Sequence, residues 1–552
     1  MIMLTARTGG NIVSARTTKK SLESNTMSII RTLHVTAVCF ATLLFAAASW
    51  AQADAETDAV SGASPEAPAP DSPGRQRAQP SMDKDQLEDA FLHWPLPAGA
   101  EAYADIDGKH LHRYVVEQAA ISRRYRDQGH PRFWGRIIGT SSDAESAEWL
   151  TAKFKASGLS DVRIQPFDLE PQWMPQSWEV SVTGGGQTLQ LESAQPTYFT
   201  SATSPEGLDL EAVYVGLGSE ADFAGREVSG KAVFVFSMVG VKSESAVRRA
   251  DDKGAAAVFN VHMLPGNMRY QAYPSGTTAP SFMLGGDDGY AVRDLIAKAG
   301  AGQAPRVSIA LDVRMTPNMT TSIVWGTLPG RTDETIYLMA HRDGWFDAAG
   351  DNASGVAAMI GLAEHFAKIP QAERRRTLVF LGLPGHHNSG LSAGGGAGAW
   401  LMKHRDELFA KTALAINCEH PSTVQTTVRP RYWGRDEIVW ANTYVGQQWY
   451  AGGSSRPQLR TIAVEAFREF GVSTYLEPNP RPPAGDLGGR VWRSVPGLTT
   501  SEFYHYFHTD QDTPETIPWT GLEASTRAYA KIIDEVNKLE LTDLQRPPEP
   551  AR

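Results

Sequence analysis

Long apolar runs are almost absent from this chain of 552 residues. The one clear run, Val35 to Ala48, follows Arg31 and precedes Ala51-Gln52-Ala53. It is too short for a membrane span, and its flanks are those of a secretory signal with a small-residue cleavage site. We therefore expect residues 1–53 to be a leader and signal peptide, with Met27 as the true start of translation. We expect the mature protein to be periplasmic or secreted.

Cysteine is scarce as well, with two residues in the whole chain. Cys39 lies inside the apolar run, so signal removal leaves Cys418 alone and excludes an internal disulfide. Exported proteins usually carry disulfides. Here the size of the chain and the burial of its core must provide the stability instead.

An excess of positive charge is also missing, because 52 Lys and Arg face 62 Asp and Glu, a net charge of −10. This balance argues against a nucleic-acid partner. We expect no stable membrane insertion once the signal is removed. The oligomeric state stays open.

Composition divides the rest of the chain. Residues 54–83 are rich in Ala, Pro, Ser and Asp, which predicts a disordered linker. Residues 84–204 and 313–540 form the two parts of a main domain, and residues 541–552 form a tail. Short β runs between Gly-containing turns set residues 205–312 apart as a small mixed domain.

The most informative stretch is Ile336 to Ala358. Its apolar start predicts a buried strand that ends in His341 and Asp343, and a helix follows Asp351. Imidazole and carboxylate are the ligands that zinc takes in catalytic sites, and one carboxylate can bridge two ions. Alternatively, His341 and Asp343 form a polar loop contact, and Asp351 caps the helix.

The run from His341 to Trp345, followed by Gly350 to Val356, resembles the co-catalytic zinc peptidases that include bacterial aminopeptidases, glutamate carboxypeptidase and the transferrin receptor. The resemblance implies an α/β fold, a mixed-sheet zinc exopeptidase-like sandwich. It also implies that residues 205–312 are an inserted β-rich protease-associated domain. In the family, the residues at His341 and Asp351 are metal ligands, and the residue at Asp343 orients the histidine.

One departure from this family follows the strand Arg375 to Leu383, where the family has two adjacent Glu, a general base and then a zinc ligand. This chain has Pro384-Gly385-His386-His387-Asn388. With one inserted residue, His386 takes the base position and His387 the ligand position. Without it, His387 takes the base position and Asn388 the ligand position. We prefer the first placement, since imidazole is a good zinc ligand and a neutral amide a poor one.

The resemblance implies two further ligands, Glu419 at the end of a strand and His508 in a His-Thr-x-x-Asp-Thr run. Cys418 is expected to be a buried thiol and His420 a loop residue. Asp486 and Arg490 could face the substrate, but neither is assigned a role.

These residues predict an exported zinc peptidase or amide hydrolase that holds two ions, or one if the altered site is weak. Asp343 and His386 are the catalytic candidates, and the expected substrate is a peptide or a small amide. No residue that captures a peptide terminus can be identified. The alternative is a catalytically impaired, peptidase-like binding protein, because the Glu pair is missing.

Overall fold

A computed structural model provides the fold. The structure describes residues 93–237, 244–300, 302–387, 401, 410–424, 426–429, 437–440, 448–451, 456–476, 485–487, 495–501 and 504–544. The predicted signal peptide, the predicted linker, Asn388 and Arg490 lie outside these residues. Of the predicted tail, Leu541–Leu544 forms the short helix α13.

The first of two large sheets has eight strands in the order β19-β18-β20-β15-β12-β14-β11-β2. Its strands are β2 (Ser160–Asp168), β11 (Thr320–Leu328), β12 (Thr335–His341), β14 (Thr377–Leu383), β15 (Thr412–Cys418), β18 (Gln448–Ala451), β19 (Thr474–Leu476) and β20 (Gly497–Ser501). Strand β12 runs parallel to β14 and β15, whereas β11 is antiparallel to β14 and β2. The predicted α/β fold with a mixed sheet is therefore confirmed.

Strand β12 is buried on both faces, which explains its continuous apolar sequence. Ile336, Leu338 and Ala340 point into one hydrophobic core, and Tyr337 and Met339 point into another on the opposite face. Because β12, β14 and β15 run parallel, their carboxyl ends meet at one edge of the sheet. Ligand sites of open α/β sheets lie at such edges.

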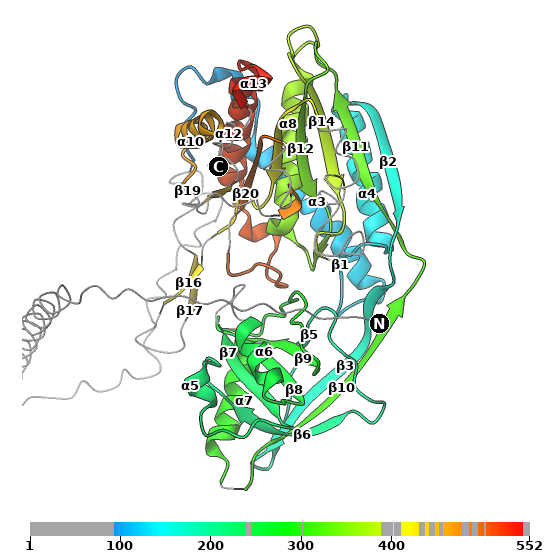
Figure 1. The fold of residues 1–552 in the computed structure, drawn as a ribbon, viewed down its shortest axis with the longest axis vertical. Coiled ribbons are helices and arrows are strands. Elements are labelled where there is room, and N and C mark those ends of the chain that lie inside the picture. Colours follow the sequence, from blue (N-terminus) through cyan, green and yellow to red (C-terminus); the bar gives the residue numbers. More distant parts are fainter. Residues whose placement is uncertain are drawn as a thin grey trace, which may run out of the picture. The chain divides into compact units, whose positions relative to one another are not determined.

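Helices cover the first of these faces: α3 (Gly108–Asp127), α4 (Ser141–Ala156), α8 (Ser354–Ala367), α10 (Pro457–Glu469) and α12 (Trp519–Asn537). Helix α8 packs against α3 and α12 (Figure 1). It is apolar on nearly all sides because it is enclosed by the sheet and these helices. Its N-terminal end is thereby fixed next to the end of β12.

The second sheet also has eight strands, in the order β4-β3-β10-β6-β7-β8-β9-β5. They are β3 (Gln172–Gly184), β4 (Gln187–Gln190), β5 (Gln195–Pro196), β6 (Leu208–Tyr214), β7 (Ala232–Ser237), β8 (Ala257–His262), β9 (Ser281–Leu284) and β10 (Arg306–Thr316). Helices α5 (Glu220–Phe223), α6 (Glu244–Asp252) and α7 (Gly286–Lys298) accompany them. This sheet includes residues 172–196, which the sequence prediction placed in the main domain.

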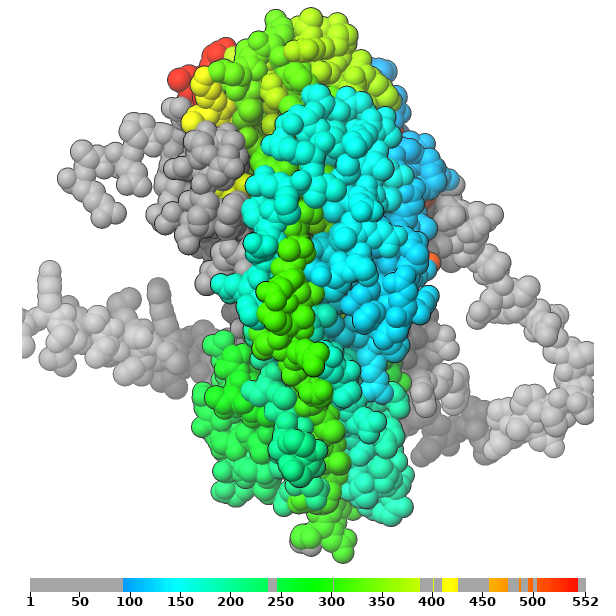
Figure 2. All heavy atoms as spheres, turned by 90° about the vertical axis from the view of Figure 1, so that its right-hand side faces the viewer, coloured from blue at the N-terminus to red at the C-terminus, as the bar shows by residue number. Residues whose placement is uncertain are grey.

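A two-stranded ribbon connects the two sheets. Strands β2 and β11 pair antiparallel up to Asp168 and Thr320, and β3 and β10 pair from Gln172 and Thr316 onward. Figure 2 shows these segments in cyan and green along one face. The sequence prediction placed β3 in the main domain and most of β10 in the small mixed domain, because β3 alternates like an ordinary half-buried strand and composition does not set it apart.

Among the described residues, no helix combines the length and the apolar character needed to cross a membrane.

Candidate metal centre

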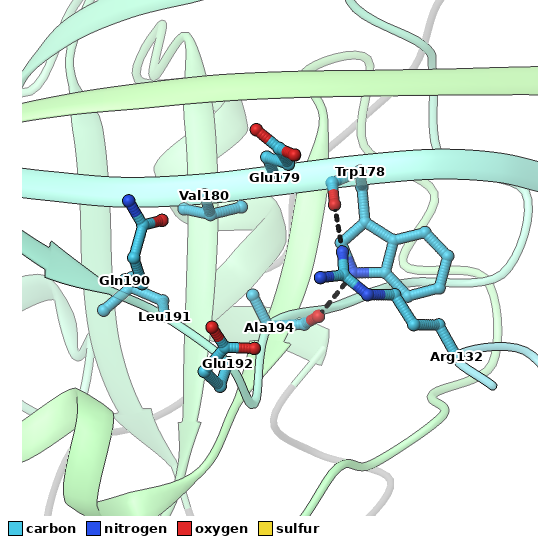
Figure 3. Close-up of a pocket in the computed structure, with 8 residues that line it drawn as sticks. All are labelled: Arg132, Trp178, Glu179, Val180, Gln190, Leu191, Glu192 and Ala194. Carbon is cyan, nitrogen blue, oxygen red and sulfur yellow. Dashed lines mark hydrogen bonds between the residues drawn. The ribbon is translucent and has the colours of Figure 1, made fainter.

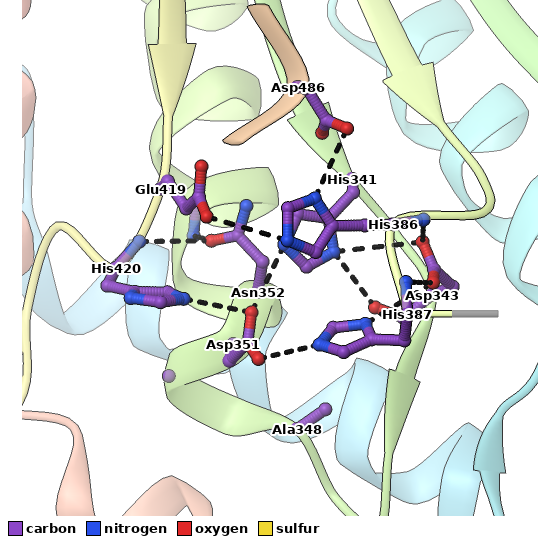
Figure 4. Close-up of polar contacts among 12 residues, drawn as sticks. His341, Asp343, Ala348, Asp351, Asn352, His386, His387, Glu419, His420 and Asp486 are labelled. Atoms are coloured by element: carbon purple, nitrogen blue, oxygen red, sulfur yellow. Dashed lines mark hydrogen bonds and ion pairs between the residues drawn. The ribbon is translucent and has the colours of Figure 1, made fainter. Parts of the chain in front are cut away.

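Asp351 is the centre of a buried cluster of histidines at the carboxyl end of the first sheet. The Nε2 atoms of His341 and His420 lie 3.1 and 2.9 Å from its Oδ1. The Nε2 atoms of His387 and His508 lie 2.7 and 3.0 Å from its Oδ2. Each carboxylate oxygen is thus shared by two imidazoles, which gives two groups of three residues that share Asp351. Figure 4 shows His387 and His420 directed at Asp351.

Three of these ligand candidates lie at the ends of neighbouring strands. His341 ends β12, His387 follows β14, and His420 follows β15. Asp351 lies in the short turn η3 (Ala349–Ala353), directly before α8. Gly355 in the first turn of α8 permits this approach, since a Cβ there would lie 2.1 Å from the carbonyl oxygen of Cys418.

Asp343 holds the loop that carries the two adjacent histidines. Its carboxylate accepts hydrogen bonds from the backbone N–H groups of His386 and His387, at 3.2 and 2.9 Å. It also lies 3.3 Å from Nδ1 of His387 and 3.7 Å from Nδ1 of His341. His341 instead has its Nδ1 3.1 Å from the backbone oxygen of Asp343. Asp343 is predicted to orient the imidazole of His341, but its carboxylate lies closer to Nδ1 of His387.

His386 lies beside the cluster and does not contact Asp351. Its ring stacks on that of His341, with 4.2 Å between centroids and 10° between planes. Its Nδ1 lies 3.4 Å from Asp486, and its Nε2 lies 3.8 Å from Glu419. Because His387 is the member of the pair that contacts Asp351, the placement with His387 as ligand and His386 as its neighbour stays our prediction.

His420, which the sequence predicts to be a loop residue, contacts Asp351, whereas the predicted ligand Glu419 forms with His341 and His386 a separate group that could hold an ion. The carboxylate of Glu419 accepts a hydrogen bond from Asn417 and faces His386, whereas His420 reaches Asp351. His420 has a φ of 47°, a left-handed conformation in which the backbone turns just after β15. A strand pattern does not predict such a turn, and the one sequence signal that could have identified His420 is its position just after a strand end.

Asp486 is the second residue that sequence reasoning missed. It lies in the short helix η5 (Gly485–Leu487) and is fully buried. Its Oδ2 has no hydrogen-bond partner among the described residues. No motif surrounds it in the sequence, and only the fold brings it to His386.

The cluster strongly perturbs its own ionisation. Burial would raise the pKa of Asp351, but the His387 and His420 imidazoles hold it well below its ordinary value. Burial would lower the pKa of His387, but Asp351 and Asp343 raise it to about 9. Burial lowers the pKa of His508 to about 3. Such opposed shifts are typical of functional sites.

The donor set fits zinc. Zinc binds neutral imidazole nitrogen and carboxylate oxygen, and it forms four-coordinate sites from three protein ligands and an open position. Each group of three around Asp351 offers two imidazoles and one carboxylate. Asp351 can bridge two ions because both of its oxygens face imidazole pairs.

A buried arginine supports the loop between His341 and Asp351. Arg136 of β1 (Gly135–Arg136) donates hydrogen bonds to the backbone oxygens of Arg342, Asp347 and Ala348, at 2.8, 2.7 and 3.0 Å. Arg136 is fully buried, and so are the three residues whose carbonyl groups it binds, so water cannot replace these hydrogen bonds. The guanidinium thereby fixes the path of the loop toward the cluster.

Replacing Arg136 by Met is expected to lower the free energy of unfolding by about 3–5 kcal/mol, because it leaves several buried carbonyls unpaired at about 1–3 kcal/mol each. Urea unfolding at a fixed zinc concentration measures the change. Arg124→Met serves as control, since it removes an exposed ion pair with Glu145. A loss below about 1 kcal/mol for Arg136→Met, the range of exposed pairs, would contradict the supporting role.

A pocket of about 240 Å³ on the second sheet is separate from the cluster. Its lining includes Arg132, Trp178 and Glu192, and none of the histidines around Asp351 (Figure 3). The guanidinium of Arg132 already donates to the backbone oxygen of Trp178. This pocket therefore does not alter the assignment of the site.

Residues 324–533 match peptidase family M28. The matched segment runs from β11 to α12 and contains every residue of the cluster around Asp351. It does not include residues 205–312, so the protease-associated identity of that segment stays a prediction. No curated protein sequence matches the chain.

Solved structures with a similar fold include the zinc aminopeptidase BSAP from Bacillus subtilis, with 17% identity and a TM-score of 0.57, covering 82% of this chain and 99% of that one. A peptidase M28 precursor from Shewanella amazonensis has 18% identity and a TM-score of 0.60, with coverage of 82% and 99%. An aminopeptidase from Aneurinibacillus sp. has 16% identity and a TM-score of 0.51, with coverage of 79% and 95%. At these identities, the likeness establishes the fold of the M28 segment and its surroundings.

Proposed function

We propose that this protein is an exported, zinc-dependent peptidase or amide hydrolase with a two-ion centre built on Asp351. One observation carries the proposal. Four imidazole Nε2 atoms lie within 3.1 Å of the Asp351 carboxylate, inside the segment that matches peptidase family M28. His341 and His420 would hold one ion with Asp351, and His387 and His508 the other.

Zinc bound there would activate a water molecule and polarise an amide carbonyl. The protein must also move protons between the water and the leaving amine. His386 is placed for this work. Asp343 holds its backbone, His341 supports its ring, and Asp486 faces its Nδ1, so that Nε2 is the atom that exchanges a proton.

The protonation of His386 depends on its surroundings. Burial would lower its pKa, but Asp486 and Glu419 raise it to about 10 in the absence of a neighbouring cation. A positive ion beside it would lower this pKa again, because like charges disfavour one another. The loaded site would therefore bring His386 toward the range in which an imidazole acts as a base.

The first substrates to test are peptides with a free amino terminus and aminoacyl anilides, because two of the structurally similar proteins are aminopeptidases. The zinc content of the mature chain should approach two per molecule, and turnover should disappear with chelator and return with zinc. Bound zinc without turnover of any peptide or amide would favour the second candidate, an impaired binding protein. The missing Glu pair favours that candidate, and a large gain in rate for His386→Glu would support it.

The pair Glu419 and His420 decides how the first ion is held. His420→Asn is expected to weaken one zinc at least about 100-fold, since a ligand contributes more than the 10–100-fold typical of outer partners. Glu419→Gln is expected to retain both ions, because Glu419 faces His386 and Asn417. Zinc titration with a competing chelator measures both affinities. Loss of an ion in Glu419→Gln alone would restore the ligand predicted from the sequence.

A further inference from the structure

The loop between β8 and β9 of the second sheet is hydrogen-bonded directly to His508, the last histidine of the cluster. The backbone N–H of Gln271 donates to the backbone oxygen of His508 at 3.0 Å. Asp510 donates its backbone N–H to the oxygen of Arg269 at 3.0 Å, and its carboxylate lies 3.2 Å from the Arg269 guanidinium. Residues 269–273 therefore lie alongside the loop that contains His508.

Tyr273, at the end of this segment, places its ring against the metal cluster. Its centroid lies 4.8 Å from that of His508, with 74° between the planes. It lies 6.0 Å from that of His387, nearly parallel at 7°, and 5.5 Å from that of Trp345. Three neighbouring rings thus fix the orientation of the phenol.

The phenol of Tyr273 lies next to His387 and His508, and both of these imidazoles contact the Asp351 carboxylate. Burial raises the pKa of Tyr273 well above the ordinary value, and Asp351, Glu419 and Asp343 raise it further. A phenol has an ordinary pKa of about 10, so Tyr273 can donate a hydrogen bond at neutral pH. Its hydroxyl makes no hydrogen bond to another described residue, unlike that of Tyr504, which donates to Asp512.

A donor that is oriented and has no hydrogen-bond partner within the described part of the chain is suited to a group that appears only when substrate binds. Cleavage of an amide places negative charge on the carbonyl oxygen in the transition state, and preorganised donors stabilise that charge. Phe507, which stacks on His508 at 3.6 Å, has no hydroxyl to offer. Tyr273 offers such a donor from another part of the chain.

We propose that Tyr273, supplied by the segment outside the M28 match, is a catalytic residue that donates a hydrogen bond from its hydroxyl to the carbonyl oxygen of the scissile amide. The phenol keeps its proton throughout, so no proton is transferred at this oxygen. The inference rests on the proposed hydrolase function and adds a contact that none of the cluster residues provides.

Tyr273→Phe in the zinc-loaded mature protein tests the proposal. The expected result is a fall in kcat of about 10²–10³-fold, the effect of removing one oxyanion donor, with KM changed less than about threefold. Zinc content and the midpoint of unfolding should equal those of the wild type. Tyr290→Phe is the matched control, because it removes a phenol hydroxyl from α7, where the ring packs on Phe236.

A phosphonate dipeptide supplies a readout other than turnover. Its tetrahedral anion should bind Tyr273→Phe at least about tenfold more weakly than the wild type, while the amino-acid product binds both equally. Wild-type activity with an unchanged Tyr273→Phe would overturn the inference and leave the hydrolase function standing. A wild type that binds zinc but neither turns over amides nor binds the phosphonate would overturn both.

Discussion

Asp351→Asn is expected to leave the protein without either zinc ion and to lower kcat/KM by about 10³-fold or more, equivalent to at least about 4 kcal/mol of transition-state stabilisation. Asp351 is the one residue shared by the two groups that enclose it. A carboxamide is neutral, and only one of its two end atoms is an acceptor. The variant therefore loses both the bridge and the anion that offsets the charge of the ions.

Asp347→Asn is the matched control for this prediction. Asp347 lies in the same loop and is also buried, but it pairs with Arg123 at 2.6 Å and belongs to neither group. We expect it to lose some stability and to retain two zinc ions, as measured by elemental analysis after dialysis. Two ions retained by Asp351→Asn, with the fold intact, would show that Asp351 is not the bridge.

The part of the site that sequence could predict is the part encoded by consecutive residues. His341, Asp343 and Asp351 stand within a strand, a loop and a helix start whose apolar patterns are unambiguous. The structure brings them together with His508, which only a resemblance had suggested. The mixed sheet followed from the same patterns.

The rest of the site depends on contacts between segments that no local pattern connects. Asp486 reaches His386 across 100 positions, and Tyr273 reaches His508 from the loop between β8 and β9. The contact between His420 and Asp351 depends on the left-handed backbone conformation of His420 itself, just after β15. Propensity and periodicity describe one segment at a time, so these partners become visible only when the sheet order and the loop paths are known.

His387→Ala is expected to remove one of the two zinc ions and to lower kcat/KM by about 10²–10³-fold, a loss of about 3–4 kcal/mol. His387 is fully buried beside Asp351, and alanine offers no replacement ligand. The ion at His341 and His420 should remain. His386→Ala is the matched control, since its ring stacks beside the cluster without contacting Asp351, and it should retain both ions.

The same site predicts proton release. In protein freed of metal, the carboxylates of Asp351 and Asp343 overcome burial and raise the pKa of His387 to about 9, so the imidazole is charged at pH 7. Zinc needs it neutral, and binding must expel the proton. The affinity for the second ion should therefore rise by up to about tenfold per pH unit up to about pH 9 and then level off.

The stability of the metal-free protein should change in the opposite direction. Because the folded pKa of His387 lies above its ordinary value of 6.5, the stabilisation from its charged form is complete below pH 6.5 and is lost as the pH rises through about 9. Calorimetry in buffers of different ionisation enthalpy measures the protons released, and urea unfolding measures the stability. Equal proton release by the wild type and His387→Ala would exclude His387 as the residue that zinc deprotonates, and would transfer that role to another member of the cluster.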